Sequence, residues 1–193
     1  MLTVGGPIAG AIEALVLVDP EGRAHSLSSH WSERDALFVF VRHFGCVACH
    51  EQIERLRARL AELEALSVRV VIVGCASSDE LAAWVERESL ASLPLTFRTD
   101  PTLAVHEALG LYHSAWRTWG PRAALGFVRA VARGTLPGPF RGAVSQQGGA
   151  LFVGRDALVR ALARSGHLGD YPSIGAMIDL ALAARVADSP LRL

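Results

Sequence analysis

The sequence contains no lysine, so its 19 basic residues are all arginines. They are balanced by 19 acidic residues, and the formal net charge is zero. Without an excess of either sign, the chain has no overall field that would attract nucleic acid or an anionic membrane. The composition therefore predicts neither a nucleic-acid partner nor a membrane partner.

Long hydrophobic runs are also missing. No apolar stretch approaches the roughly 20 residues that cross a bilayer. The N-terminal region carries Glu13, Asp19 and Glu21 but lacks the basic start of a secretory signal. We therefore expect a soluble, cytoplasmic protein. With 193 residues, 51% of them hydrophobic, the chain is predicted to form a single domain (1–193) with a real core, preceded by a loose Gly-rich arm over residues 1–13.

Cysteine is scarce, and three residues in 193 do not make a disulfide framework. Two of them, Cys46 and Cys49, form a C-x-x-C pair, which between a strand and a helix is typical of redox chemistry in a reducing compartment. A zinc site would need two more ligands. No second C-x-x-C exists, although His43 and His50 flank the pair, so a redox pair is favoured over a metal site or a buried structural pair. The third cysteine, Cys75, is expected to pack in the core.

Hydrophobic patterning places the cysteines in a β-α-β unit. The apolar runs 36–42 and 68–73 predict two buried, parallel strands. Between them, apolar residues recur every three or four positions from Cys49 to Leu63, which predicts one long amphipathic helix opened by the cysteines. A thiol at a helix start faces unpaired N–H groups and the positive end of the helix dipole, and both favour the thiolate.

Shorter elements are predicted on either side of this unit. Residues 157–163 fit a hairpin partner for the strand before them, although their composition also fits a helix. The Gly- and Pro-rich stretch 134–142 is predicted to be a loop. The other expected strands are 14–18, 95–98 and 150–153, and the other expected helices are 77–89, 101–109, 113–133 and 173–187.

Three short segments carry a family resemblance: the string from Phe40 to Cys49, the string from Gln146 to Gly154, and Gly169-Asp170-Tyr171-Pro172. They resemble, in order, the redox loop, the Gln-Gly-Gly strand motif and the C-terminal signature of peroxiredoxin-like proteins of the AhpC/TSA antioxidant group. The resemblance implies an α/β, thioredoxin-like fold. Such a fold has a central mixed β-sheet flanked by helices, with the C-x-x-C at the N-terminus of the first long helix.

The resemblance also implies thiol-dependent redox chemistry on a peroxide or endoperoxide, with no bound cofactor or metal. Cys46 would match the attacking cysteine and Cys49 the resolving one, assisted by the nearby cationic residues Arg42 and His43. An external dithiol such as thioredoxin, or a small thiol, would act as reductant, and a homodimer would fit the family. The substrate-binding positions implied are Phe44, Gly45, Gln147, Gly148 and Gly149.

Two departures from better-known relatives leave the reaction open. A standard peroxiredoxin has Thr three residues before the attacking cysteine, where this chain has His43. Thioredoxins place a cis-proline opposite the dithiol, where this chain has the segment 146–149. Protein dithiol–disulfide exchange and a biosynthetic redox step therefore stand beside peroxide reduction as alternatives. A redox sensor or binding protein without turnover is the further alternative.

Overall fold

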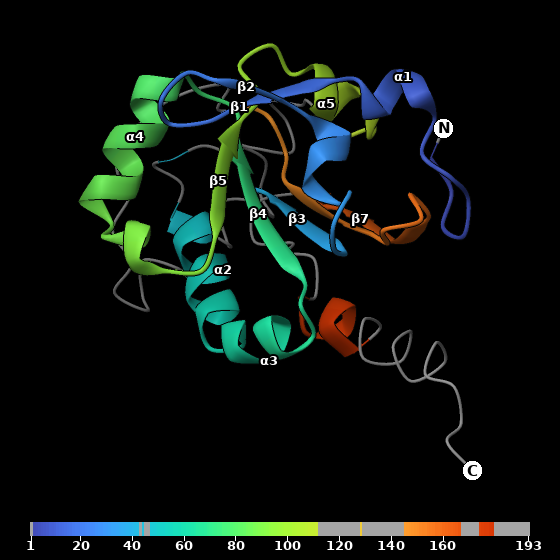
Figure 1. Ribbon diagram of the computed structural model, residues 1–193. Helices are drawn as coiled ribbons and strands as arrows, with labels where there is room; N and C mark the ends of the chain where they lie inside the picture. The colour runs from blue at the N-terminus through green and yellow to red at the C-terminus, as the bar shows by residue number, and fades with distance from the viewer. Residues whose placement is uncertain are drawn as a thin grey trace.

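The structure is a computed structural model that describes residues 2–42, 44, 47–111, 128, 145–166 and 174–179, without the side chains of 47–51 (Figure 1). The predicted loop 134–142, the segment 169–172 and nearly all of the predicted helix 113–133 lie outside these residues. Of the predicted C-terminal helix, residues 174–179 are described, and they are helical.

Seven strands form one mixed sheet in the order β2-β1-β5-β4-β3-β6-β7 (Figure 1). β3, β4 and β5 are parallel, β6 runs antiparallel to β3, and β1 runs antiparallel to β5. The predicted mixed sheet and its central parallel pair are therefore confirmed. The strands are β1 (Val16–Val18), β2 (Ala24–Ser26), β3 (Ala36–Phe40), β4 (Arg69–Gly74), β5 (Thr96–Thr99), β6 (Gly149–Val153) and β7 (Val159–Arg164).

Helices cover both faces of this sheet. α2, α3, α4 and the helical residues 174–179 pack on one face, whereas α5, the 3-10 helix η1 and the N-terminal segment pack on the other. The described helical elements are α1 (Gly10–Glu13), η1 (Leu27–His30), α2 (Val47–Arg57), α3 (Leu60–Ala65), α4 (Ser78–Arg87), η2 (Leu90–Ser92) and α5 (Ala104–Ala108).

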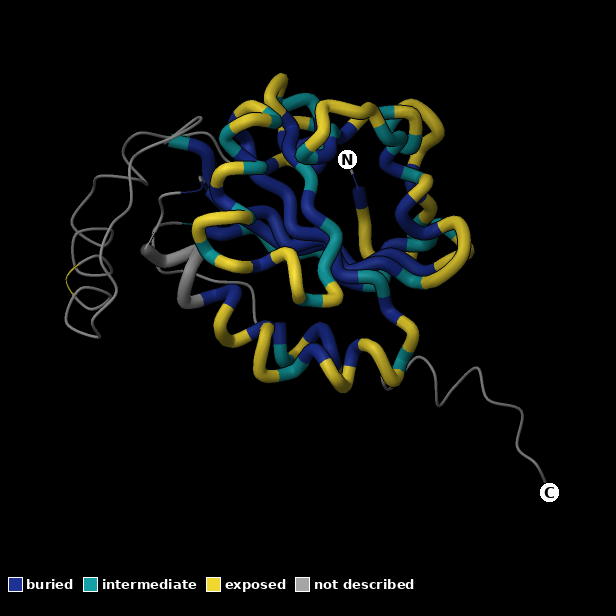
Figure 2. The backbone as a smooth tube through the Cα atoms, turned by 60° about the vertical axis from the view of Figure 1, so that its left-hand side comes forward, coloured by how far each residue is buried: buried dark blue, intermediate teal, exposed yellow. Residues whose placement is uncertain are grey.

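The central strand β3 is buried along its whole length, as Figure 2 shows for the middle of the sheet. Leu37 and Val39 point to the face covered by α2 and α3, while Phe38 and Phe40 belong to the core of the opposite face. Side chains alternate between faces along a strand, so a run that is apolar at every position requires cover on both sides.

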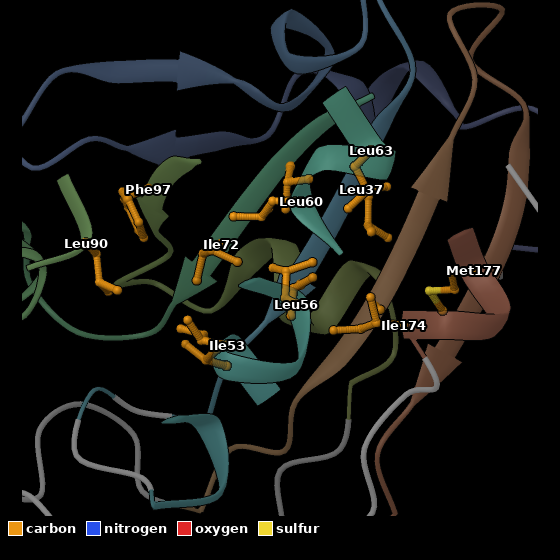
Figure 3. Close-up of a cluster of buried hydrophobic side chains, with 14 of the residues drawn as sticks. Leu37, Ile53, Leu56, Leu60, Leu63, Ile72, Leu90, Phe97, Ile174 and Met177 are labelled. Carbon is orange, nitrogen blue, oxygen red and sulfur yellow. The ribbon is translucent and has the colours of Figure 1, made fainter. Parts of the chain in front are cut away.

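The predicted long helix after the cysteines is interrupted. α2 ends at Arg57 and α3 begins at Leu60, with Arg59 in a non-helical conformation between them (φ −120°, ψ 9°). The Arg59 guanidinium donates to the Glu62 carboxylate from Nε at 2.8 Å. The apolar stripe nevertheless continues across the break, because Ile53, Leu56, Leu60 and Leu63 are all buried in one cluster (Figure 3).

The prediction of a loose arm over residues 1–13 is wrong for residues 2–13, which the structure describes. The Gly5 N–H donates to Val159 O at 2.8 Å, and the Ile8 N–H donates to Ala157 O at 3.0 Å. Leu2 and Ile8 are buried. These backbone bonds pair the N-terminal segment with the start of β7 at Val159 and with the residues just before it, where the outer edge of the strand would otherwise present unpaired groups. Side-chain periodicity carries no signal of such pairing, because the bonds join main-chain atoms.

Smaller differences concern where elements begin. Ser77, rather than the expected Ser78, caps α4: its hydroxyl accepts from the Glu80 N–H at 3.3 Å, and the Glu80 carboxylate accepts from the Ser77 N–H at 3.1 Å. This reciprocal pattern is a capping box. α5 begins three residues after the expected start at Pro101, and residues 157–163 are confirmed as a strand partner of β6.

Candidate redox site

Three segments meet at one edge of the sheet. β3 and β4 are parallel, so their carboxyl ends lie at the same edge. β6 is antiparallel to β3 with Gly149 opposite Phe40, so the loop that precedes β6 lies at this edge too. Functional side chains in α/β proteins gather beyond the carboxyl ends of parallel strands. The topology therefore brings Arg42, two residues after β3, beside the segment 146–149.

Gly148 makes this approach possible. A Cβ atom there would lie 2.5 Å from the Phe40 carbonyl oxygen and 3.8 Å from Arg42 Cγ. Any side chain at this position would have to displace backbone, which explains why the loop needs glycine here. The Gly148 carbonyl also accepts from the Ser165 N–H at 3.0 Å. The loop is thus held between the chain after β3 and the end of β7.

Arg42 is buried, with 5% of its surface exposed. Its carbonyl oxygen accepts a hydrogen bond from Cys75 Sγ at 2.8 Å. Cys75 is itself buried, as expected, and it follows β4 directly. Arg42 thus brings a positive charge to this edge of the sheet, and such a charge favours the ionised form of a neighbouring thiol.

Phe44 lies in the core. Only 2% of its surface is exposed, and its ring stacks on Trp84 of α4 with 4.8 Å between centroids. Gly74 faces the ring, where a Cβ atom would overlap it. Arg87 Nη2 of α4 donates to the Phe44 carbonyl at 3.4 Å. The ring is therefore enclosed instead of facing a substrate, contrary to the expectation for this side chain.

The cysteine pair lies at the limit of the described residues. α2 begins at Val47, so Cys49 is in its first turn. Cys46, His43 and Gly45, and the side chain of Cys49, lie outside the described residues. The roles expected for these four residues remain predictions.

The glutamines before Gly148 are also buried. Gln146 Nε2 donates to the carbonyl oxygens of Leu111 at 3.5 Å and Gln147 at 3.1 Å. Gly149 packs against the same leucine, because a Cβ atom there would lie 2.6 Å from Leu111 Cδ2. The loop 146–149 thus lies directly against Leu111, which follows α5 by three residues.

A buried acid–histidine pair that the sequence patterns did not predict lies at this edge. Asp100 follows β5, and its Oδ2 accepts from His106 Nδ1 at 2.8 Å and from the N–H groups of Val105 and His106 at 2.9 and 3.0 Å. Burial tends to raise the pKa of Asp100, but the hydrogen bonds from His106 outweigh it and the pKa is lowered. A polar residue just after a predicted strand, at the edge where sites gather, was the available signal.

Two negative findings concern the described part of the chain. No three side chains among its His, Cys, Asp and Glu residues are grouped so that they could hold a metal ion. In that same part, none of the helices combines the length and the apolar character that crossing a membrane requires.

Solved structures with a similar fold are peroxiredoxins and thiol peroxidases. Peroxidoxin BcpB from Mycobacterium tuberculosis superposes with a TM-score of 0.65 over 98% of this chain and 100% of its own, at 16% identity. Thiol peroxidase from Chromobacterium violaceum also gives 0.65, over 95% of this chain and 88% of its own, at 14% identity. These likenesses confirm the predicted thioredoxin-like fold.

Curated relatives and a family model agree with the fold. Thioredoxin-like protein AAED1, chloroplastic, from Arabidopsis thaliana is 28% identical over 68% of this chain, a match that spans about half (52%) of the plant protein. Peroxiredoxin-like 2C from Mus musculus is 26% identical over 91% of this chain and 81% of its own. The model of the AhpC/TSA antioxidant enzyme family matches residues 55–164, which is more than half of the chain and begins after the C-x-x-C. The chain therefore belongs to the AhpC/TSA antioxidant enzyme family.

Proposed function

We propose that this protein is a thiol-dependent oxidoreductase that reduces a peroxide or endoperoxide, with Cys46 as the nucleophile. The observation that carries the proposal is the buried Arg42, four residues before Cys46, whose backbone carbonyl accepts from Cys75 Sγ and whose side chain lies beside Gly148. A fixed cation at the start of this loop favours a thiolate there. Family membership supports the same reading.

An endoperoxide has no terminal oxygen: attack by the Cys46 thiolate would open its O–O bond to a sulfenate ester and a protonated alkoxide, and Cys49 would then release a diol as the disulfide forms. With a hydroperoxide, the Cys46 thiolate attacks the terminal peroxide oxygen. The O–O bond breaks, Cys46 becomes a sulfenic acid, and the leaving oxygen takes a proton and departs as an alcohol or water. The Cys49 thiol then attacks the Cys46 sulfur, forming a disulfide and releasing water. An external dithiol, a thioredoxin or similar reductant, restores both thiols by two exchange steps.

The remaining predicted residues have supporting roles in this proposal. Arg42 and His43 would stabilise the thiolate and the departing oxygen. Gly45 would leave backbone groups open to the substrate, since glycine allows close approach. Gln147, Gly148 and Gly149 are buried, so in this proposal they would act by holding the segment 146–149 beside Arg42. Phe44 would act through its position, because its stacking on Trp84 anchors the middle of the loop.

Protein dithiol–disulfide exchange is the second candidate. It is favoured by the likeness to a relative named thioredoxin-like. The chemistry would use the same two cysteines, but the electrophile would be a disulfide sulfur instead of a peroxide oxygen.

The test treats the fully reduced protein with one equivalent of hydrogen peroxide, of a bulky organic hydroperoxide, or of a disulfide donor. Free thiols are alkylated at timed intervals and mapped by mass spectrometry. We expect rapid formation of a Cys46–Cys49 disulfide with a peroxide. Cys49→Ser should stop at a sulfenic acid on Cys46, and Cys46→Ser should not react. Cys75→Ser is the matched control, because it removes the one cysteine outside the pair while its hydroxyl can still donate to the Arg42 carbonyl.

Other outcomes discriminate between the candidates. Oxidation by the disulfide donor but not by either peroxide would replace the proposal by dithiol exchange. Turnover that survives Cys46→Ser but not Cys49→Ser would reverse the two roles. Thiols that react with none of the three reagents would show that the pair is structural and that the enzyme proposal is wrong.

A further inference from the structure

The Asp100–His106 pair is fully enclosed yet incompletely satisfied. Both side chains are 0% exposed. One ring nitrogen of His106 is bonded to Asp100, whereas Nε2 has no hydrogen-bond partner within the described residues. Leaving a buried polar atom without a partner costs about 1–3 kcal/mol. Nε2 takes no part in the bond to Asp100, so holding Asp100 does not by itself account for this second ring nitrogen.

The pair contacts the strands that lead into the candidate redox site. The Asp100 N–H donates to the Gly74 carbonyl at 2.9 Å, and Gly74 is the residue that packs on Phe44. The His106 ring meets the Phe40 ring edge-on, with 5.2 Å between centroids and 77° between planes. Phe40 is the last residue of β3, two before Arg42. The pair thus touches the ends of both parallel strands that form the site.

The pair also contacts the loop on the other side of the site. The His106 carbonyl accepts from the Leu111 N–H at 2.9 Å. Leu111 in turn lies against Gly149, and its carbonyl accepts from Gln146 Nε2. Through Leu111, a shift of α5 would therefore move the loop 146–149.

We propose that Asp100 and His106 are positioning residues for the candidate redox site, setting the loop 146–149 against Arg42. This inference rests on the proposed function of Cys46. A Cβ atom built on Gly148 would lie 3.8 Å from Arg42 Cγ, so the loop flanks the aliphatic part of the Arg42 side chain and a shift of the loop would move that side chain. Because the effect of a charge on a thiol falls with distance, displacing Arg42 raises the pKa of Cys46 and slows its attack.

The experiment compares three variants with the unmodified protein. His106→Leu removes the donor to Asp100. His106→Asn keeps a donor in the place of Nδ1 and dispenses with Nε2. His30→Leu is the matched control, because His30 is equally buried on the same face of the sheet but bonds Arg98 and backbone carbonyls. The readouts are the thermal midpoint, the pH dependence of Cys46 alkylation, and kcat and KM with the peroxide.

We expect His106→Leu to raise the pH midpoint of Cys46 alkylation and to lower kcat on the order of tenfold, the scale of a slight misplacement of a catalytic group. His106→Asn should recover most of both effects. His30→Leu should lower the thermal midpoint but leave the alkylation profile unchanged. If His106→Leu and His30→Leu destabilise equally and neither moves the alkylation midpoint, the pair is structural only and the proposal is overturned.

Two further results keep the test decisive. Should His106→Leu not fold, Asp100→Asn takes its place, since the amide oxygen still accepts the backbone N–H groups. An unchanged alkylation midpoint in that variant would also overturn the proposal. If the unmodified protein shows a low alkylation midpoint but never turns over a peroxide, the proposed function fails by itself. The alkylation profiles of the variants would then still show whether Asp100 and His106 act as positioning residues.

Discussion

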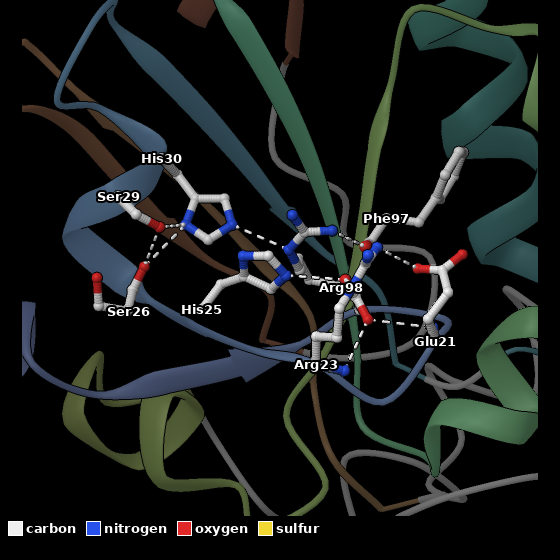
Figure 4. A network of polar contacts seen from close by, with 9 residues as sticks. Glu21, Arg23, His25, Ser26, Ser29, His30, Phe97 and Arg98 are labelled. Atoms are coloured by element: carbon white, nitrogen blue, oxygen red, sulfur yellow. Dashed lines mark hydrogen bonds and ion pairs between the residues drawn. The ribbon is translucent and has the colours of Figure 1, made fainter.

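The two buried histidines His106 and His30 lie on the same face of the sheet and have partners of opposite charge. His106 donates from Nδ1 to the Asp100 carboxylate. His30 accepts at Nε2 from Arg98 Nε at 3.2 Å and donates from Nδ1 to the carbonyl oxygens of Ser26 and Leu27, both at 3.1 Å (Figure 4). Burial lowers the pKa of His30 to about 4; the bond to Leu27 opposes this and the charge of Arg98 adds to it.

The two buried carboxylates, Asp100 and Asp19, differ in how far the side chains paired with them are exposed to water. Asp19, beside β1, is buried and accepts from Arg23 Nε and His25 Nε2, both at 2.8 Å (Figure 4). Burial tends to raise the pKa of Asp19, but these hydrogen bonds lower it below its ordinary range. The Arg23 side chain is 70% exposed, whereas His106 is not exposed at all. Loss of Asp19 leaves partners that water can reach, and loss of Asp100 does not.

The largest expected effect is that of Asp100→Ala. Removing one member of a buried pair leaves the other without compensation, so we expect the free energy of unfolding to fall by about 3–5 kcal/mol. Asp19→Ala should cost less, because Arg23 and His25 can turn to solvent. Urea unfolding of both variants measures the difference. Equal losses of unfolding free energy would show that the exposure of the partner side chains does not determine the cost of removing either carboxylate.

The second prediction concerns pH. The unfolded chain, with His30 at its ordinary pKa of 6.5, binds more protons between pH 6.5 and about 4 than the folded chain does. The titration of His30 should therefore lower the stability by about 3 kcal/mol as the pH falls through this window, and its contribution should not change further below it. The lowered pKa values of Asp19 and Asp100 place their contributions at lower pH.

Unfolding curves measured across the pH range test this prediction. The substitution His30→Leu should abolish the slope of unfolding free energy against pH between pH 6.5 and 4. His106→Leu is the control and should keep that slope. A slope that persists unchanged in His30→Leu would assign it to other groups.

A smaller effect is expected where the candidate site needs glycine. Gly148→Ala forces a methyl group against the Phe40 carbonyl and should cost about 1–3 kcal/mol, with a loss of peroxide turnover. Gly10→Ala, in α1, is the matched control: a Cβ atom there meets nothing within 4 Å. It should be neutral or slightly stabilising. A neutral Gly148→Ala would mean that the loop does not approach β3 as closely as described.

The smallest expected effect is that of Arg23→Ala. The exposed guanidinium is paired with exposed Glu21 and with buried Asp19, and water and salt screen its charge. Without it, Asp19 still accepts from His25 and from the N–H groups of Glu21 and Arg23. We expect only a slight decrease in the thermal midpoint, and the decrease should shrink at high salt. A large decrease that does not depend on salt would show that Arg23 stabilises the fold as a buried pair does. The expected difference between Arg23 and Asp100 would then be wrong.

Much of the fold could be predicted because it depends on patterns that lie within short segments. The continuous apolar runs of β3 and β4 predict strands covered on both faces, and the three- to four-residue repeat predicts the helix between them. Strand β2 was missed, since three residues with exposed and half-buried side chains carry no pattern. The N-terminal pairing with β7 was missed because it uses backbone atoms.

Part of the candidate site could also be predicted, because short segments of the sequence carry recognisable motifs. Arg42 and the segment 146–149 could be named from motifs, and the sheet brings them together. Asp100 and His106 could not, because nothing in their spacing shows that both would be enclosed beside Phe40. Phe44 was assigned to substrate binding, since only the packing of Trp84 and Gly74 shows that its ring is in the core.

The sequence by itself determined the class of fold, the central parallel pair of strands and the cysteine pair as the place to look for chemistry, because local periodicity and short motifs carry that information. The tertiary structure alone decided which polar groups are buried together. Cys75 and Arg42 are 33 positions apart and hydrogen-bonded, and Gly148 lies more than a hundred positions from the strand it touches. Burial and electrostatics depend on distance in space, and that distance is set only when the sheet has assembled.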